Sequence, residues 1–253
     1  MGNVHQYYLK HIADKTGYRA TWEPNKPLTL GAIVKINKGV FAILSSLEKE
    51  GIPFEVLEDS SEGTLDYSSS ETVQIGIKAA GQIPAAGSVL SAADAGFSID
   101  FGSDKSILFQ ADKTKTHQIN NIASIEREVI KRVGEGRWDK NWLIVTELLE
   151  ADTATIIVSF STNSKIEIKA NANVGASQLK LTDASLELSV VSEKGSLFKA
   201  VASKGITPLY RVMGYHHPLF GKGQLKTRSL EGPPAEQFGV QEFDPAELED
   251  NLN

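Results

Sequence analysis

Regular alternation of apolar and polar residues runs through two long stretches of this chain. In the first stretch, residues 73–79 and 97–109, the apolar side chains fall mostly on odd positions. In the second, residues 156–174, they fall mostly on even positions, and the same phase returns over 186–190. Because successive side chains of a β-strand point to opposite faces, both stretches predict strands with one apolar and one polar face.

Two other segments have the spacing of amphipathic helices. In residues 4–15, Val4, Tyr8 and Ile12 recur every four residues. In residues 121–133, apolar residues recur at intervals of three or four, and a glycine follows. Residues spaced in this way share one face of a helix, so both segments predict a helix with one buried side.

Shorter apolar runs complete the expected fold. Residues 28–44 predict two strands joined by a turn at 37–39, and residues 51–59 predict another strand. Residues 60–70 are rich in Ser and Glu and predict a loop, whereas the run 142–150 fits either a strand or a buried helix. We therefore expect an α+β fold, a twisted antiparallel sheet with amphipathic hairpins and flanking helices.

The alternation is compatible with two structures. Strands of globular proteins average about five or six residues, and this phase holds about three times longer. One structure is a curved antiparallel sheet with one face on the core and the other in water. The other is a pair of hairpins that re-form as membrane-spanning strands, which takes about nine to eleven residues per strand. The pattern alone does not choose, because an apolar face can meet either a core or acyl chains.

Charge is distributed unevenly along the 253 residues, which carry 26 Lys and Arg against 32 Asp and Glu for a net charge of -6. Residues 229–253 hold seven acids and no base, so the body has 32 − 7 = 25 acids against 26 bases. We divide the chain into a body, 1–228, and an acidic tail, 229–253. The tail is either a solvated terminus or a regulatory segment covering a basic or apolar surface, and Lys226 and Arg228 mark a candidate site of activating proteolysis.

Several classes of protein are disfavoured. The chain has no cysteine, no stretch resembling a signal peptide, and no uncharged run long enough for a membrane helix, so we expect a cytoplasmic protein. It lacks GxSxG and HExxH motifs, and the adjacent His216 and His217 project oppositely on a strand rather than forming a metal site. We expect no enzyme activity, no metal and no cofactor. The nearly neutral body also argues against nucleic-acid binding.

The order of these elements resembles that of a known family. A basic amphipathic helix precedes LGAIV at 30–34, and an alternating hairpin with an Ala/Gly-rich middle follows. A helix, the run RWDKNWLIVTE at 137–147, a second alternating hairpin and GITPLYRV at 205–212 complete the order. Over residues 1–220 the chain resembles the pore-forming domain of the gasdermin family. It is most similar to the short fungal gasdermin-like cell-death proteins, with bacterial gasdermins next.

The resemblance implies a pore-forming function. Gasdermins bind acidic lipids, refold two hairpins into membrane strands and assemble into a large β-barrel pore that lyses the cell. Transferred to this sequence, the lipid-facing residues of the first hairpin are Val73, Ile75, Ile77, Phe97, Ile99 and Phe101. Those of the second hairpin are Ile156, Val158, Phe160, Ile166, Ile168, Leu186, Leu188 and Val190. The residues implied to contact acidic headgroups are Lys10, Lys15, Arg19, Arg127, Lys131 and Arg132.

The resemblance also implies partners and a trigger. We expect no inhibitory C-terminal domain of the mammalian kind, because the chain is too short for one, and the absence of cysteine argues against the lipid anchor of bacterial gasdermins. Restraint is then expected from the acidic tail or from the need for a second protein. Fungal relatives include members activated by a protease and pairs of variants that kill only when mixed, in heterokaryon incompatibility and allorecognition. The partners implied are acidic phospholipids of the plasma membrane, further copies or a related variant, and an activating protease.

A second class of function competes with pore formation. A β-rich binding module, carrying a lipid or another small apolar ligand, would have the same alternating strands around an internal cavity. Such a module predicts a monomer that is unchanged by lipid membranes.

Overall fold

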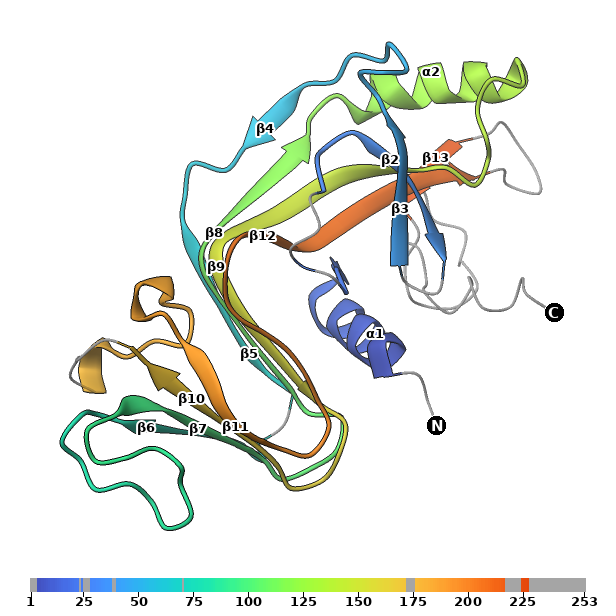
Figure 1. Cartoon of the computed structure of the whole chain (residues 1–253). Helices are drawn as coiled ribbons and strands as arrows, with labels where there is room; N and C mark the ends of the chain where they lie inside the picture. Colours follow the sequence, from blue (N-terminus) through green and yellow to red (C-terminus); the bar gives the residue numbers. More distant parts are fainter. Residues whose placement is uncertain are drawn as a thin grey trace. The chain divides into compact units, whose positions relative to one another are not determined.

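The computed structural model describes residues 4–22, 24, 28–37, 40–69, 71–171, 176–216 and 224–227. Within this part of the chain, two α-helices accompany strands that pair antiparallel, which confirms the predicted α+β fold (Figure 1). The chain divides into two compact units. Unit 1 comprises Met1–Ser61, Lys115–Glu150 and Thr207–Asn253, and unit 2 comprises Glu62–Thr114 and Ala151–Ile206.

Unit 1 is organised around a sheet with the strand order β1-β12-β9-β2-β3. The bounds of these strands are Arg19–Ala20, Leu197–His216, Leu143–Ser159, Ala32–Asn37 and Val40–Ser46. The predicted strands β2 and β3 pair antiparallel, and residues 38 and 39 of the turn expected between them lie outside the described residues. The apolar run beginning at 142 forms a strand rather than a helix. Adjacent residues such as Ile33 and Val34 are both buried, so the central strands have a core on each face.

One helix packs in each of the two predicted places. Helix α1, Val4–Thr16, contacts β1 and buries Tyr8 and Ile12. Helix α2, Ile122–Gly134, buries Ile125 and Val129 against a cluster that includes Ile33 and Ile144. Figure 1 shows α1 and α2 on opposite sides of the unit 1 sheet.

Unit 2 contains the separate four-stranded sheet β11-β10-β7-β6. These strands span Ser189–Lys194, Ser164–Ala170, Ala95–Phe101 and Val73–Lys78. Unit 2 also holds β5, Gly63–Ser68, paired with the first half of β8, Ile107–Ile119. The first predicted hairpin is confirmed over β6 and β7, whose ladder pairs six residues of each strand. Its predicted continuation to Phe109 is wrong, because Ile107 and Phe109 lie in β8, which pairs with β5.

The second predicted hairpin is wrong in its bounds. The alternation over 156–174 is interrupted, because β9 ends at Ser159 and β10 begins at Ser164. Serine hydroxyl groups lie across the break: Ser159 Oγ is 2.9 Å from the Ser161 carbonyl oxygen and 2.9 Å from Ser164 Oγ, contacts that stabilise a turn. The hairpin is instead β10–β11, and Ile156 and Val158 belong to β9 in the larger sheet.

Two shorter predictions also need correction. Only Val56–Glu58 of the expected strand at 51–59 is a strand, β4, which pairs with β8. The loop expected over 60–70 is wrong, because β5 lies there. Its polar side chains are mostly exposed, so pairing with β8 satisfies the backbone without any apolar alternation in the sequence.

Candidate functional site

The candidate site is the four-stranded sheet of unit 2, whose register places apolar side chains in common rows. Ile77, Phe97, Ile168 and Val190 occupy one row across all four strands. The next row holds Ile75, Ile99 and Ile166 on three of them. Directly opposed residues of an antiparallel pair share a face, so these rows form one continuous apolar face over β6, β7 and β10. On β11 the second row ends in Glu193, opposite Ile166.

The opposite face of the same sheet is polar across its whole width. Gln74, Asp100, Lys165 and Lys194 form one row. In parallel rows, Ser98 lies opposite Glu167, and Gly96 lies opposite Lys169. The sheet formed by β6, β7, β10 and β11 is therefore two-faced; we call it the two-faced sheet.

Segment 179–186, with parts of β8 and β9, covers most of the apolar face. Leu179, Leu181 and Leu186 pack against the buried residues of β7 and β10 in one cluster. Coverage is incomplete at the edge strand β6, where Ile75 remains 39% exposed and Ile77 50% exposed. The apolar face is thus part of the core at its centre and open at one edge.

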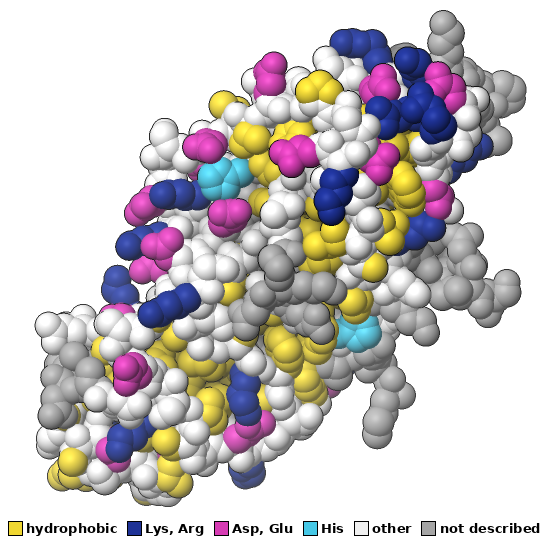
Figure 2. All heavy atoms as spheres, turned by 45° about the horizontal axis from the view of Figure 1, so that its top comes forward, with side chains coloured by type: hydrophobic (Ala, Val, Ile, Leu, Met, Phe, Trp, Pro, Cys, Tyr) yellow, Lys and Arg dark blue, Asp and Glu magenta, His cyan; other side chains and the backbone are white. Residues whose placement is uncertain are grey.

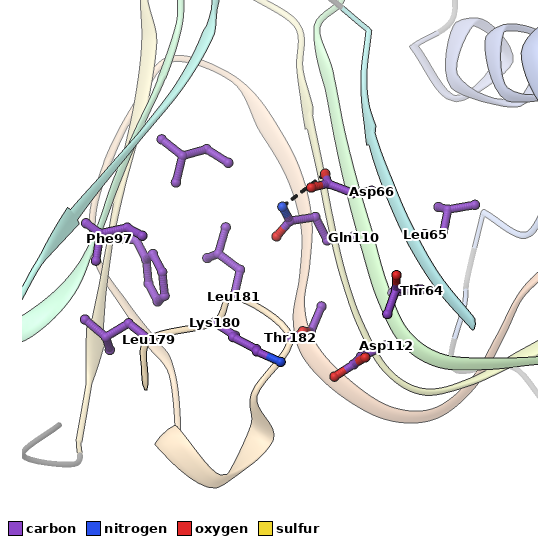
Figure 3. Close-up of a pocket in the computed structure, with 13 residues that line it drawn as sticks. Thr64, Leu65, Asp66, Phe97, Gln110, Asp112, Leu179, Lys180, Leu181 and Thr182 are labelled. Carbon is purple, nitrogen blue, oxygen red and sulfur yellow. Dashed lines mark hydrogen bonds between the residues drawn. The ribbon is translucent and has the colours of Figure 1, made fainter. Parts of the chain in front are cut away.

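A cavity of about 380 Å³ lies at this open edge. Its apolar lining includes Ile75, Ile77 and Phe97 from the two-faced sheet, together with Leu179 and Leu181. In Figure 3, Phe97 and Leu179 face the space from the β6–β7 side, and polar residues of β5 and β8 border it across from them. Among the latter, Gln110 Nε2 donates to Asp66 at 3.1 Å.

The long connection between β6 and β7, residues 79–94, covers part of the polar face. Glu167 lies on this face yet is only 2% exposed. Its Oε2 accepts a hydrogen bond from the backbone N–H of Val89 at 2.8 Å, and Lys165 Nζ lies 3.4 Å from Oε1. A buried carboxylate requires such partners to offset the cost of losing water.

Two lysines of the polar face also contact the connection. Lys169 Nζ lies 2.5 Å from a carboxylate oxygen of Asp94, and Lys78 Nζ donates to the Asp94 carbonyl at 2.5 Å. Hydrogen bonding by Lys169, followed by hydrogen bonds from Ser91, lowers the pKa of Asp94 below its usual value. The carboxylate is therefore ionised throughout the neutral range, and the contact with Lys169 is a salt bridge there.

The structure brings most of the predicted hairpin residues together. Val73, Ile75, Ile77, Phe97, Ile99, Phe101, Ile166, Ile168 and Val190 all lie in the two-faced sheet. Phe160 follows the end of β9, while Leu186 ends a short 3-10 helix, Ala184–Leu186, with Leu188 between that helix and β11. These three residues and the two in β9 are not on hairpin strands in this conformation.

The predicted headgroup contacts belong to unit 1. Lys10 and Lys15 are exposed on α1, and Arg127 and Lys131 are exposed on α2. Because the two helices lie on opposite sides of the sheet, these bases do not form one patch (Figure 1). Figure 2 shows Lys and Arg side chains gathered around α2 with acidic side chains among them.

The other two predicted contacts are less accessible. Arg132 is 11% exposed in its side chain, and its guanidinium bonds the Glu128 carboxylate at 2.8 Å and the Glu50 carbonyl at 2.7 Å. It therefore joins α2 to the segment before Gly51 rather than facing solvent. Arg19 is half-buried in β1, opposite Tyr210 of β12.

The candidate cleavage region is described only in part. The backbone of Lys226 lies in β13, Gln224–Thr227, opposite Gly214 of β12. Arg228 and the acidic tail, 229–253, lie outside the described residues.

Sequence reasoning missed Glu167, Lys169 and Asp94. The alternation places the first two on the polar face of a strand, where solvated charges are the ordinary expectation. Nothing in the sequence indicates that a connection 73 or more residues earlier covers them. Over the described residues, no group of three or more metal-ligating side chains occurs, and no helix is long and apolar enough to cross a membrane.

Comparisons with known proteins give limited information. No protein-family model and no curated protein matches this sequence. Among solved structures, the chain is similar to the gasdermin A3 membrane pore determined by cryo-EM, at 12% identity and a TM-score of 0.35. The match covers 96% of this chain and 100% of the gasdermin A3 chain. A similarity of this size carries no conclusion about function.

Proposed function

We propose that this protein is a pore-forming cell-death effector, in which the two-faced sheet transfers its apolar face from the protein core to membrane lipid. The register of that sheet carries the proposal, since apolar residues of β6, β7 and β10 share rows and the charged residues of these three strands lie on the opposite face. Strands in a bilayer require this division, because one face meets acyl chains and the other meets water.

In the proposed membrane state, hairpins β6–β7 and β10–β11 become transmembrane strands and protomers assemble edge to edge. The strands β6 and β11 lie at the two edges of the described sheet. Unpaired backbone groups at an edge are costly in lipid, so the strands need neighbours and the assembly needs to close into a barrel. The neighbours are further copies of this chain or of a related variant.

The second hairpin supports the same interpretation. Continuing the β10–β11 register beyond the pair Lys169–Ser189 places Ala170 opposite Leu188 and residue 172 opposite Leu186. Both leucines then join the apolar face, although neither lies on a strand in the described conformation. The predicted lipid-facing role of Leu186 and Leu188 thus depends on lengthening of the hairpin.

Attachment to acidic phospholipids is assigned to the exposed bases of α1 and α2. Each Lys or Arg near an anionic surface contributes on the order of 1 kcal/mol, so several bases must act together. The inactive protein would be cytoplasmic and would move to the cell membrane on assembly. We expect no enzyme activity and no cofactor in this process, and we assign restraint to the acidic tail or to a required second variant.

Dye release from vesicles tests the proposal. Vesicles of phosphatidylcholine with phosphatidylserine should leak when mixed with the intact chain, with the chain cleaved after Arg228, or with a paired variant. Pure phosphatidylcholine vesicles should not leak. Attachment before insertion should weaken as salt rises, because surface charges are screened, whereas inserted protein should resist salt. Absence of release under all three conditions would contradict pore formation.

The cavity at the edge of the apolar face favours a second candidate function. A space of about 380 Å³ lined by Ile75, Ile77 and Phe97 is within the size range of small-ligand sites. The protein would then be a non-enzymatic carrier of a small apolar ligand. A long-chain fatty acid should raise the melting temperature in proportion to its occupancy, and Phe97→Ala should remove that effect.

A further inference from the structure

The described hairpin β6–β7 is too short to cross a bilayer. Its ladder pairs six residues of each strand, from Val73 opposite Phe101 to Lys78 opposite Gly96. A transmembrane strand requires about nine to eleven residues. If the proposed function is correct, residues outside the present ladder must supply the missing length.

The connection between the two strands keeps its charged residue in the same phase as the charges of those strands. From residue 73 to residue 101, all charged side chains stand at even positions: Lys78, Asp94 and Asp100. The odd positions between the strands hold Ala, Gly, Ile and Val, with Ser91 as the single polar residue among them. The odd positions of residues 79–94 are therefore uncharged, as on the apolar face of the sheet, although the buried Leu90 stands at an even position.

The existing register also continues into the connection. Five further pairs beyond Lys78–Gly96 would end with Ile83 opposite Ser91. Each strand would then have eleven residues, 73–83 and 91–101, with Pro84 and Gly87 in the turn between them. In the described conformation the N–H of Gly81 donates to the carbonyl of Ala92 at 2.8 Å, which joins the two ends of the connection one residue out of this register.

We infer that residues 79–94 are part of the membrane-spanning hairpin, stored across the polar face until the protein inserts. This inference rests on the proposed function. In the described conformation these residues form turns rather than strands, and Glu167, Lys169 and Lys78 hold them. Ile83 is 91% exposed and Val89 is 58% exposed, so both apolar side chains face water in the described conformation. Insertion would bury both side chains in lipid.

Glu167 is the positioning residue for this storage. It belongs to hairpin β10–β11 but bonds the connection of hairpin β6–β7, so neither hairpin can extend fully while the bond persists. In the extended state the polar face lines the water-filled lumen, where the carboxylate regains its hydration. Breaking the hydrogen bond between the Val89 N–H and Glu167 would therefore allow both hairpins to extend together.

Single cysteines labelled with an environment-sensitive fluorophore test the inference, because the native chain contains none. The labelled variants are Gln82→Cys, Ile83→Cys, Ala92→Cys and Ala93→Cys, whose native residues are all exposed in the described fold. Gln74→Cys and Ile75→Cys serve as references in β6. The chain cleaved after Arg228 is added to vesicles of phosphatidylcholine and phosphatidylserine in equal parts.

The inference predicts blue-shifted emission at 83 and 93, as at 75, and unchanged emission at 82, 92 and 74. A shift at 75 without alternation between 82 and 83 would overturn the inference and leave the proposed function standing. No shift at 75 or at 83 on vesicles that bind the protein would overturn both.

Substitution of Glu167 provides an independent test. Glu167→Ala should speed dye release by about tenfold, because a charge-assisted hydrogen bond to the connection is lost. Glu167→Gln retains an acceptor for the Val89 N–H and should have a smaller effect. The melting temperatures of both variants identify any misfolding. An unchanged release rate in a folded Glu167→Ala protein would show that this bond does not hold the connection.

Discussion

The two units use their sheets differently. In unit 1, neighbouring residues such as Ile144 and Val145 are both buried, because β2, β9 and β12 have a cluster on each face. In the two-faced sheet of unit 2, the exposed Asp100 stands between the buried Ile99 and Phe101. A sheet buried on both faces cannot meet water without losing its core, whereas a two-faced sheet can exchange its apolar covering for lipid. In the proposed function, unit 1 is therefore the constant scaffold and unit 2 undergoes the conformational change.

The largest expected effect comes from removing one leucine that covers the two-faced sheet. Leu181→Ala and Ile125→Ala each truncate a buried side chain, one in unit 2 and one in unit 1. Each should lower the free energy of unfolding by about 2–5 kcal/mol in urea titrations. Only Leu181→Ala should accelerate dye release, because Leu181 packs on the apolar face that must be uncovered. Equal acceleration by both variants would remove the distinction between the units.

A pair of arginines on α2 separates stability from membrane attachment. Arg132→Ala should lower the free energy of unfolding by about 1–3 kcal/mol, because the Glu50 carbonyl and the Glu128 carboxylate lose their partner. Arg127→Ala should leave stability unchanged and weaken binding to acidic vesicles by about fivefold, which corresponds to about 1 kcal/mol. Flotation and thermal unfolding of both variants measure the two effects. Equal loss of vesicle binding would show that the exposure of Arg127 is irrelevant.

A smaller effect is expected from two aspartates whose pKa values lie below the usual range. Hydrogen bonding by Lys169 lowers the pKa of Asp94 in unit 2, and hydrogen bonding by Lys35 lowers that of Asp139 in unit 1. A depressed pKa in the folded state stabilises that state above the unfolded value of about 4, and the contribution is lost as pH falls toward the folded value. Both contributions are therefore intact at pH 7.

The two corresponding amide variants test both contributions, at acidic and at neutral pH. Asp94→Asn and Asp139→Asn should each make the free energy of unfolding less dependent on pH below about pH 4. At pH 7, Asp94→Asn should speed dye release moderately by weakening the hold on residues 79–94, while Asp139→Asn should leave the rate unchanged. Release that is faster only in Asp139→Asn would reverse the roles of the units.

The sequence was sufficient where side-chain spacing decides local structure. The period of Val4, Tyr8 and Ile12 predicted α1, and the alternation over 73–79 predicted β6 and its apolar face. The sequence was insufficient where hydrogen bonds between distant segments determine the local structure. Polar β5 is held by its backbone pairing with β8, and buried Glu167 acquires its role from a connection in another hairpin. The turn before Ser164 did leave a trace, because Thr162 and Ser164 put polar residues at even positions, where the alternation otherwise has apolar ones.

The most direct test of the central claim compares two adjacent residues of β6. Ile75 lies on the apolar face and Gln74 on the polar face, and both are exposed at this edge, so aspartate at either position should leave the fold intact. Dye release from acidic vesicles should fall by at least about tenfold in Ile75→Asp, because its charge would face lipid. Release should remain near the wild-type rate in Gln74→Asp, whose charge would face water. Equal release by the two folded variants would contradict insertion of the two-faced sheet.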